Sequence, residues 1–198
     1  MIKECVLASA SPRRAELLKQ IGVEFTIQVS NVDETIDEKV LPEVMVGELA
    51  YRKAYDVAKK CKNKLVIGAD TIVVCDDIIL GKPRDEQHAE EILTLLSDRC
   101  HKVMTGIAIV DSDTNEVWQW VETTLVYFRA LSKEDIRGYL NRKEYIDKAG
   151  GYGIQGYGAL LVEKIEGCYF NVVGLPLSAL AIGLKEMGVN VYGNEKQF

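Results

Sequence analysis

An aspartate inside a continuous apolar segment is the feature of this sequence that most restricts its fold. Residues 65–75 read LVIGADTIVVC, which predicts a buried strand. Asp70 interrupts this strand, although aspartate is a poor strand former and a sheltered carboxylate needs a cation, a metal ion or hydrogen-bond donors. Such positions are enriched in catalytic bases and metal ligands; the alternative is a structural ion pair at a strand end.

Helices and strands are both predicted around this segment. Helices are expected at residues 12–21, 42–60 and 176–187, and after the capping residues Asp85 and Ser132. Further strands are expected at 4–8, 25–29, 78–80, 101–110 and 117–128, with a last hairpin formed by 159–165 and 168–173. Because the two kinds of element mix without strict alternation, we expect an α/β protein with a mixed, strongly twisted sheet flanked by helices.

Hydroxyl and guanidinium side chains gather where the first predicted helix begins, in the sequence SASPRR. They are Ser9, Ser11, Arg13 and Arg14, with Ser11 as N-cap and Pro12 at the first helical position. A helix N-terminus presents free backbone N–H groups and the positive end of the dipole, so this set suits a phosphate chain. The alternative is an ordinary capped helix whose arginines are solvated.

Lys53 lies on the apolar face of the helix predicted for residues 42–60. The positions that share this face are Val46, Leu49, Ala50, Lys53 and Val57. A buried ammonium without a partner costs several kcal/mol, so the side chain needs an anion. The alternative is that the long side chain reaches past its neighbours into water.

Two glycine-containing segments are further candidates. In Gly81-Lys82-Pro83 the bend and the stiff proline can aim Lys82, although a solvated turn lysine is the usual case. Residues 151–156, GYGIQG, match the letters of the dinucleotide-binding fingerprint, but β-rich residues follow instead of a helix, which argues against that function. We expect this loop to be a place where the backbone approaches a ligand closely.

Composition limits the classes of function. The chain has 198 residues, 47% of them apolar, which suits one domain with a real core. A net charge of -6 argues against a nucleic-acid groove, but a small anion can still bind in a locally basic pocket. The five widely spaced cysteines predict free thiols in a reducing compartment, the cytoplasm. No signal peptide is expected, and no run of about 18 apolar residues that could span a membrane is found.

Taken together, the motifs resemble one family. The chain contains, in the order seen in Maf proteins, SASPRRAELL, ELAYRKA, VIGADTIVV, LGKP, TGIAIV, DKAGGYGIQGYGALLVEKIEG and NVVGLPL. The resemblance implies a single domain over residues 1–198 with an inosine triphosphate pyrophosphatase-like (Maf/Ham1-type) fold, two lobes around a cleft. It also implies a nucleoside triphosphate pyrophosphatase that needs a divalent metal ion, Mg²⁺ or Mn²⁺. Homodimers and a link to septum formation in bacteria are known in the family.

The resemblance also assigns roles to individual residues. Asp70 matches the proton acceptor, and Glu34 matches an acidic position that helps to hold the metal ion with Asp70. The polar cleft positions are matched by Ser9, Arg14, Lys53 and Lys82. Substrate choice is tied to Arg13, Thr71 and Gln155, and at all three this sequence follows the branch that acts on dTTP and UTP, not the branch that acts on 7-methyl-GTP.

The sequence therefore predicts hydrolysis of dTTP or UTP, and of modified pyrimidine nucleotides as a further option, to the monophosphate and pyrophosphate. Such an activity would limit incorporation of unwanted nucleotides. Neither nucleic acid nor a membrane is expected as a partner. The alternatives are a non-catalytic regulator of cell division that binds a partner protein, and a module that senses nucleotides without turnover.

Overall fold

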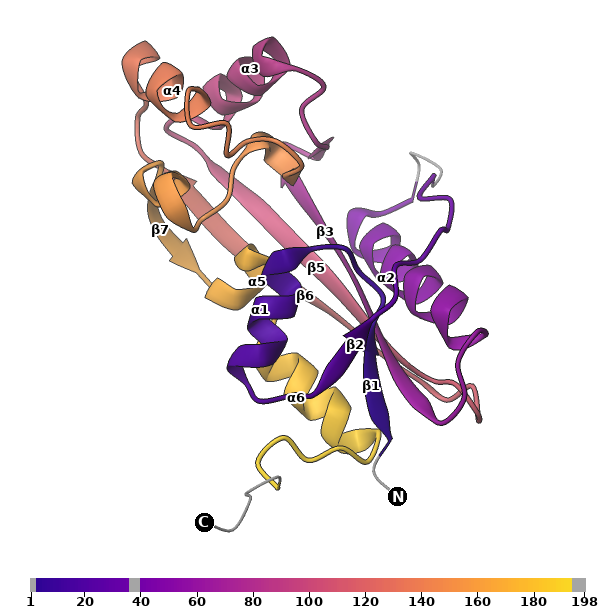
Figure 1. Ribbon diagram of the computed structural model, residues 1–198. Coiled ribbons are helices and arrows are strands. Elements are labelled where there is room, and N and C mark those ends of the chain that lie inside the picture. Colours follow the sequence, from indigo (N-terminus) through magenta and orange to yellow (C-terminus); the bar gives the residue numbers. More distant parts are fainter. Residues whose placement is uncertain (1–2, 36–39, 194–198) are drawn as a thin grey trace. The chain divides into compact units, whose positions relative to one another are not determined.

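The computed structural model describes residues 3–35 and 40–193. The helices are α1 (Pro12–Gln20), α2 (Pro42–Ala58), α3 (Glu86–Leu96), α4 (Lys133–Leu140), α5 (Tyr169–Val173) and α6 (Leu177–Glu186), with 3₁₀ helices η1 (Ala149–Gly151) and η2 (Gly156–Leu160) (Figure 1). The strands are β1 (Glu4–Leu7), β2 (Phe25–Ile27), β3 (Lys64–Cys75), β4 (Ile78–Leu80), β5 (Cys100–Asp111), β6 (Val117–Phe128) and β7 (Val162–Glu166).

The strands in the described residues form one mixed sheet of seven strands. Its order is β2-β1-β3-β5-β6-β7, with β4 paired to β3. β1 runs parallel to both β2 and β3, whereas β4 is antiparallel to β3 and β7 is antiparallel to β6. The predicted class, an α/β protein with a mixed sheet flanked by helices, is confirmed.

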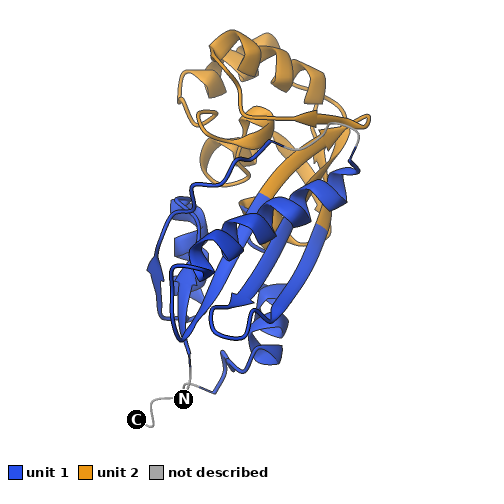
Figure 2. Ribbon diagram, turned by 90° about the vertical axis from the view of Figure 1, so that its right-hand side faces the viewer, with its two compact units in different colours: residues 1–70, 105–122, 174–198 blue, residues 71–104, 123–173 orange. Residues whose placement is uncertain are grey.

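The chain divides into two compact units (Figure 2). Unit 1 takes residues 1–70, 105–122 and 174–198, and unit 2 takes residues 71–104 and 123–173. The long strands β3, β5 and β6 each contribute residues to both units. The resemblance implies a single domain over residues 1–198, and the division into two units does not test this prediction.

In unit 1, helix α2 lies against one face of the strands, and α1 and α6 lie on the opposite face (Figure 1). The apolar stripe of α2 packs on alternating residues of β1, β3 and β5, which is the arrangement expected for an amphipathic helix on a sheet. The fully or nearly fully buried members of this core are Val6, Ala8, Ala50, Ala54, Val57, Ala58, Val66, Ala108 and Val110.

Two glycines let α2 approach the sheet closely. A Cβ atom at Gly68 would lie 2.3 Å from the carbonyl oxygen of Ala50 and 2.7 Å from the backbone nitrogen of Ala54. A Cβ atom at Gly106 would lie 2.3 Å from the carbonyl oxygen of Val46. Only glycine fits at these two positions, because the atoms it faces belong to the helix backbone and cannot move independently.

Gly68→Ala is expected to lower the free energy of unfolding by about 1–3 kcal/mol, because the added methyl group must push α2 away from β3. Urea denaturation followed by circular dichroism measures the change. Gly138→Ala, in the interior of α4, is the matched control, since its Cβ atom would meet no atom within 4 Å. That variant should be unchanged or slightly more stable; equal stability of both variants would contradict the close approach at Gly68.

The core of unit 2 holds an imidazole ring among aromatic side chains. His101 on β5 is 2% exposed, and its ring stands edge-on to Phe128 and Tyr152 at centroid distances of 5.0 and 5.4 Å. Its Nε2 atom lies 2.6 Å from the Tyr152 hydroxyl oxygen, so the two side chains share a hydrogen bond. Burial lowers the pKa of His101 to about 4, which keeps the ring neutral at physiological pH.

This shift predicts how stability depends on pH. The unfolded chain protonates His101 near pH 6.5 and the folded chain only near pH 4, so the stability contributed by the neutral ring is complete above pH 6.5 and is lost as pH falls towards 4. The expected loss is about 3 kcal/mol at pH 4. His101→Gln should flatten the pH dependence by this amount. Parallel curves for wild type and His101→Gln would contradict the prediction.

The predicted helices and strands up to residue 140 and the last helix are confirmed, with ends within two residues of those predicted. Both capping residues act as expected. The Asp85 carboxylate accepts a hydrogen bond of 2.7 Å from the His88 N–H group, and Ser132 forms a capping box with Asp135.

The last predicted hairpin is wrong. Of its first half, residues 162–165 lie in β7, which pairs with β6, and residues 159–160 lie in η2. Residues 169–173 of the second half form helix α5. Asn171 explains the difference, because its fully buried side-chain amide donates to the Val103 carbonyl and to Thr124 Oγ1, each at 2.9 Å. These buried hydrogen bonds to β5 and β6 outweigh the β-propensity of the neighbouring residues.

The five cysteines carry free thiols, as their spacing predicts. Burial raises the pKa of the Cys5 thiol to about 11, so this side chain is unreactive at neutral pH.

In the part of the chain that the structure describes, no helix combines the length and apolar character needed to cross a lipid bilayer.

Candidate active site

Three charged side chains of unit 1 meet at Lys53. The Lys53 Nζ atom lies 2.6 Å from Asp70 Oδ1 and 3.0 Å from Glu34 Oε1. Lys53 is 8% exposed, and the Asp70 and Glu34 side chains are 13% and 61% exposed. One ammonium thus joins two carboxylates at the border between the core and the solvent, and the lysine head does not extend freely into water.

Local structure explains why these side chains meet. Lys53 occupies the buried stripe of α2, and Asp70 lies in β3 two residues beyond Gly68. Because Gly68 allows α2 to touch β3, the ammonium of Lys53 reaches the Asp70 carboxylate directly. Lys53 and Asp70 therefore serve as each other's counterion.

Arg14 connects the first helix to the same strand. Its Nη1 donates to Ser9 Oγ at 3.0 Å and to the Ala69 carbonyl at 2.9 Å, and its Nε donates to the Gly174 carbonyl at 2.9 Å. Burial lowers the pKa of Arg14, whereas the negative charge of Asp70 acts in the opposite direction. Arginine is not deprotonated in proteins, so a positive charge is held one residue from Asp70.

Ser11 occupies the N-cap position of α1, but its hydroxyl makes no capping hydrogen bond. The Ser9 hydroxyl instead accepts a hydrogen bond of 3.2 Å from the Ser11 N–H group. Arg13, beside Arg14, is half-buried, and its positive charge adds to the lowering of the Arg14 pKa. Like charges held together in this way favour binding of an anion.

The donor set of unit 1 fits a hard divalent cation that shares its ligands with a substrate. Within residues 3–35 and 40–193, no group of three histidine, cysteine or acidic side chains forms a closed metal cage. Glu34 and Asp70 offer two carboxylates. Mg²⁺ is commonly bound by one or two carboxylates together with water and substrate phosphates, so this open pair suits that ion.

Unit 2 brings two other predicted segments together. The Gly150 N–H group donates to the Gly81 carbonyl at 3.1 Å, and a Cβ atom at Gly151 would lie 3.1 Å from Pro83 Cγ. The lysine turn and the glycine loop are therefore neighbours. Lys82 and Gln155 are exposed, and Thr71, which follows Asp70 in β3, is half-buried.

Several residues that shape these sites were not predicted from the sequence. Gly68 and Gly106 set the distance of α2 from the sheet, and Gly174 supplies a carbonyl that holds Arg14. A glycine inside an apolar strand can signal close backbone approach, so Gly68 was detectable in principle. The Gly174 carbonyl carries no sequence signal.

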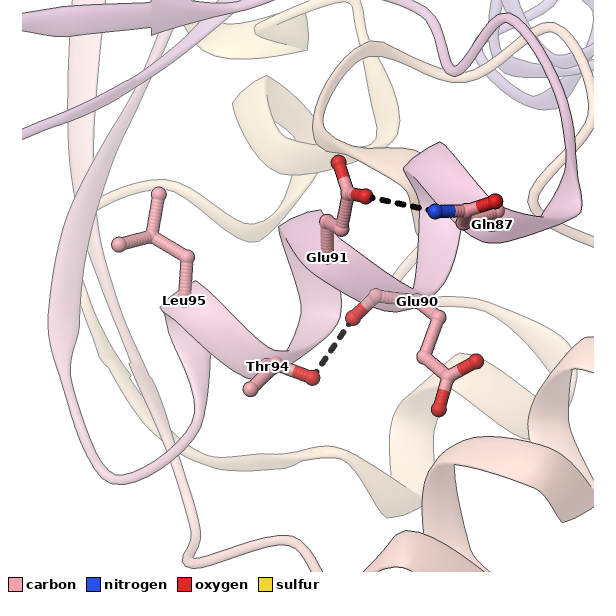
Figure 3. Close-up of a pocket in the computed structure, with 5 residues that line it drawn as sticks. All are labelled: Gln87, Glu90, Glu91, Thr94 and Leu95. Atoms are coloured by element: carbon pink, nitrogen blue, oxygen red, sulfur yellow. Dashed lines mark hydrogen bonds between the residues drawn. The ribbon is translucent and has the colours of Figure 1, made fainter.

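A separate surface pocket follows one side of α3 and contains none of the predicted site residues. It is lined by Gln87, Glu90, Glu91, Thr94 and Leu95 (Figure 3). The polar groups bond within the helix: Gln87 Nε2 donates to Glu91 at 3.3 Å, and Thr94 Oγ1 donates to the Glu90 carbonyl at 2.7 Å. This pocket is the solvated face of an amphipathic helix.

Fold and site together define a mixed α/β protein with a cationic and carboxylate-bearing centre suited to a phosphorylated ligand. The family model described as Maf-like protein matches residues 4–187, and the chain belongs to this family.

The relatives cover nearly the whole chain. The dTTP/UTP pyrophosphatase of Acetivibrio thermocellus is 52% identical over 94% of this chain and 96% of its own length. The dTTP/UTP pyrophosphatase of Clostridioides difficile is 48% identical over 94% of this chain and 97% of its own length. The solved structure of the Staphylococcus aureus Ham1 protein is 21% identical, with a TM-score of 0.47 over 64% of this chain and 72% of that chain.

Proposed function

We propose that this chain hydrolyses dTTP and UTP to the nucleoside monophosphate and pyrophosphate, with Mg²⁺ or Mn²⁺ as cofactor. The observation that carries the proposal is the contact of Lys53 with Asp70 and Glu34. Arg14 binds the carbonyl of Ala69, the residue before Asp70. The shared name of relatives 45–52% identical to this chain supports the same activity.

The proposed reaction is attack of water on the α-phosphorus. The new bond joins the water oxygen to that phosphorus, the bond to the bridging oxygen of the β-phosphate breaks, and pyrophosphate leaves. Asp70 accepts the proton that the water loses. Phosphoryl and nucleotidyl transfer depend mainly on positioning and neutralisation of charge. Lys53 and Arg14 provide this neutralisation, and Lys82 does so by the family resemblance.

Glu34 and Asp70 would hold the metal ion. When bound, a divalent ion neutralises charge on the phosphates and orients them. Both carboxylates also contact Lys53, so an ion bound by them would share these oxygens with the ammonium. The proposed reaction then needs no covalent intermediate, because the chain's own residues supply the base and a cation.

Hydrolysis in water enriched in oxygen-18 tests the bond that is cut. Purified protein, Mg²⁺ and dTTP should give labelled monophosphate and unlabelled pyrophosphate, as read by mass spectrometry. Label in pyrophosphate, or release of single orthophosphate, would show attack at another phosphorus. The same assay without Mg²⁺ and with Mn²⁺ tests the metal requirement.

Base choice is predicted to depend on Gln155 and Thr71. The Gln155 amide can accept from the N3–H group of uracil or thymine and donate to a neighbouring carbonyl. We expect dTTP and UTP to be preferred over 7-methyl-GTP, whose ring is cationic. Gln155→Glu combined with Thr71→Gln should shift the ratio of kcat/KM towards 7-methyl-GTP by about 10–100-fold, since a charged hydrogen bond is worth about 1.5–3 kcal/mol.

Measuring both substrates on both proteins decides this prediction. Gln119→Glu, an exposed glutamine of unit 1, adds the same charge away from the glycine loop and should leave the ratio unchanged. If the double variant keeps the wild-type ratio, these two side chains do not recognise the base.

A non-catalytic regulator of cell division is the alternative function, and absence of pyrophosphate release from the purified, folded protein would favour it. A homodimer, a division partner and a cytoplasmic location remain predictions. Sedimentation of the purified protein at several concentrations tests the dimer.

A further inference from the structure

The loop at residues 150–157 has a backbone that is costly to order. Gly150, Gly151 and Gly156 have positive φ angles of 68°, 69° and 62°. Glycine loses more conformational entropy on ordering than any other residue, so a loop of this composition needs fixed contacts to keep one shape. Gln155 is exposed in this loop, next to Ile154, which is buried.

The inner side of the loop is fixed by Tyr152. Its side chain is 5% exposed and packs edge-on against Phe128 at a centroid distance of 4.7 Å. Its hydroxyl shares the 2.6 Å hydrogen bond with Nε2 of His101 on β5. Among the described residues Nδ1 of His101 has no hydrogen-bond partner, so Tyr152 provides the hydrogen bond of this buried ring. Strand β5 thereby holds the loop three residues before Gln155.

The outer side of the loop is fixed by Glu144. Its carboxylate oxygens accept from the Tyr157 N–H group at 3.1 and 3.4 Å, two residues after Gln155. A Cβ atom at Gly156 would lie 2.9 Å from both of these oxygens, so the carboxylate sits directly against the loop backbone. The Arg142 guanidinium covers the Tyr157 ring at 4.2 Å from its centroid.

We propose that Tyr152, through its hydrogen bond to His101, and Glu144 are positioning residues that hold Gln155 in the orientation that recognises the pyrimidine base. The inference rests on the proposed function, because it assigns the base contact to Gln155. A fixed amide discriminates between uracil and cytosine, which present opposite donor and acceptor patterns, whereas a mobile amide can turn and serve either base. The two anchors thus supply selectivity without touching the nucleotide.

Tyr152→Phe tests the inner anchor, since it removes the hydroxyl and keeps the ring. We expect KM for UTP to rise about tenfold with a smaller change in kcat, and the ratio of kcat/KM for UTP over CTP to fall by a similar factor. Thr124→Val is the matched control: it removes another buried hydroxyl of unit 2, one bonded to Cys168 and Asn171 and not to the loop. It should lower stability and leave the ratio at its wild-type value.

His101 offers an independent test of the same contact. His101→Gln keeps a hydrogen-bonding group for the Tyr152 hydroxyl and should retain selectivity, whereas His101→Leu should lose it. If Tyr152→Phe does not fold, the ratio of kcat/KM for UTP over CTP is compared between these two His101 variants instead. Glu144→Gln weakens the outer contact to Tyr157 and should also lower the ratio.

Amide hydrogen exchange of the loop separates this inference from the proposed function. Peptides that cover residues 150–157 should exchange faster in Tyr152→Phe than in wild type or Thr124→Val, whether or not the protein turns over UTP. Unchanged exchange, or an active Tyr152→Phe variant with the wild-type ratio of UTP to CTP, would overturn the inference. If the wild-type protein has no pyrophosphatase activity, faster exchange in Tyr152→Phe would uphold the anchor, and the base contact would be rejected together with the proposed function.

Discussion

Asp70→Asn is expected to lower the turnover of dTTP by about 10²–10⁴-fold, the range typical for loss of a general base. The asparagine keeps the shape of the side chain, and its oxygen can still accept the hydrogen bond that Lys53 donates at 2.6 Å. It cannot take a proton from water, and it contributes no negative charge to a metal ion. Binding of dTTP should therefore be weakened less than turnover, which calorimetry and steady-state kinetics can compare on the same preparation.

Asp111→Asn is the matched control for this variant. Asp111 is another carboxylate of unit 1 that is paired with a lysine, since Lys3 Nζ lies 2.6 Å from its Oδ1. No catalytic role is proposed for it, so its replacement should cost stability and leave turnover close to wild type. Near-normal turnover in Asp70→Asn would mean that the Asp70–Lys53 contact is a structural ion pair, the alternative that the apolar strand also allows.

Periodicity explains why half of this centre could be predicted from the sequence. A helix repeats about every 3.6 residues, so the apolar neighbours of Lys53 place it on the buried stripe of α2. A continuous apolar strand is buried on both faces, so Asp70 had to be sheltered wherever it pointed. Both deductions need only local sequence, and both are met by the contact between the two side chains.

Glu34 lacks such a signal. It lies outside the helices and strands, and its place at Lys53 follows from tertiary packing and not from periodicity; the sequence suggested it only through the family resemblance.

Helix α5 is an element that local sequence predicted wrongly. Its residues YFNVV favour a strand locally, and Asn171 in their middle was the visible exception. Its two partners, Val103 and Thr124, are distant in sequence, and only the folded chain brings them together.

Lys53→Met is expected to reduce dTTP turnover by about 10²–10³-fold, the effect typical of removing one group that stabilises transition-state charge. Methionine fills similar space without charge, so α2 should still pack on β3. Lys3→Met is the control, because it removes the ammonium from the comparable pair with Asp111 and should leave turnover unchanged. Normal hydrolysis by Lys53→Met would mean that the lysine is dispensable for the reaction.

Lys53→Met also distinguishes the role of the Lys53 ammonium from that of the divalent metal ion in the proposed centre. Without Lys53, the carboxylates of Asp70 and Glu34 both lose their ammonium partner, which should cost about 1–3 kcal/mol of stability in metal-free buffer. A divalent ion should restore much of this loss, because it can bind the same oxygens and binds only the folded chain. Thermal unfolding with and without Mn²⁺ should therefore show a larger metal-induced shift in Lys53→Met than in wild type or Lys3→Met. Equal shifts in all three proteins would place the metal ion away from Asp70 and Glu34.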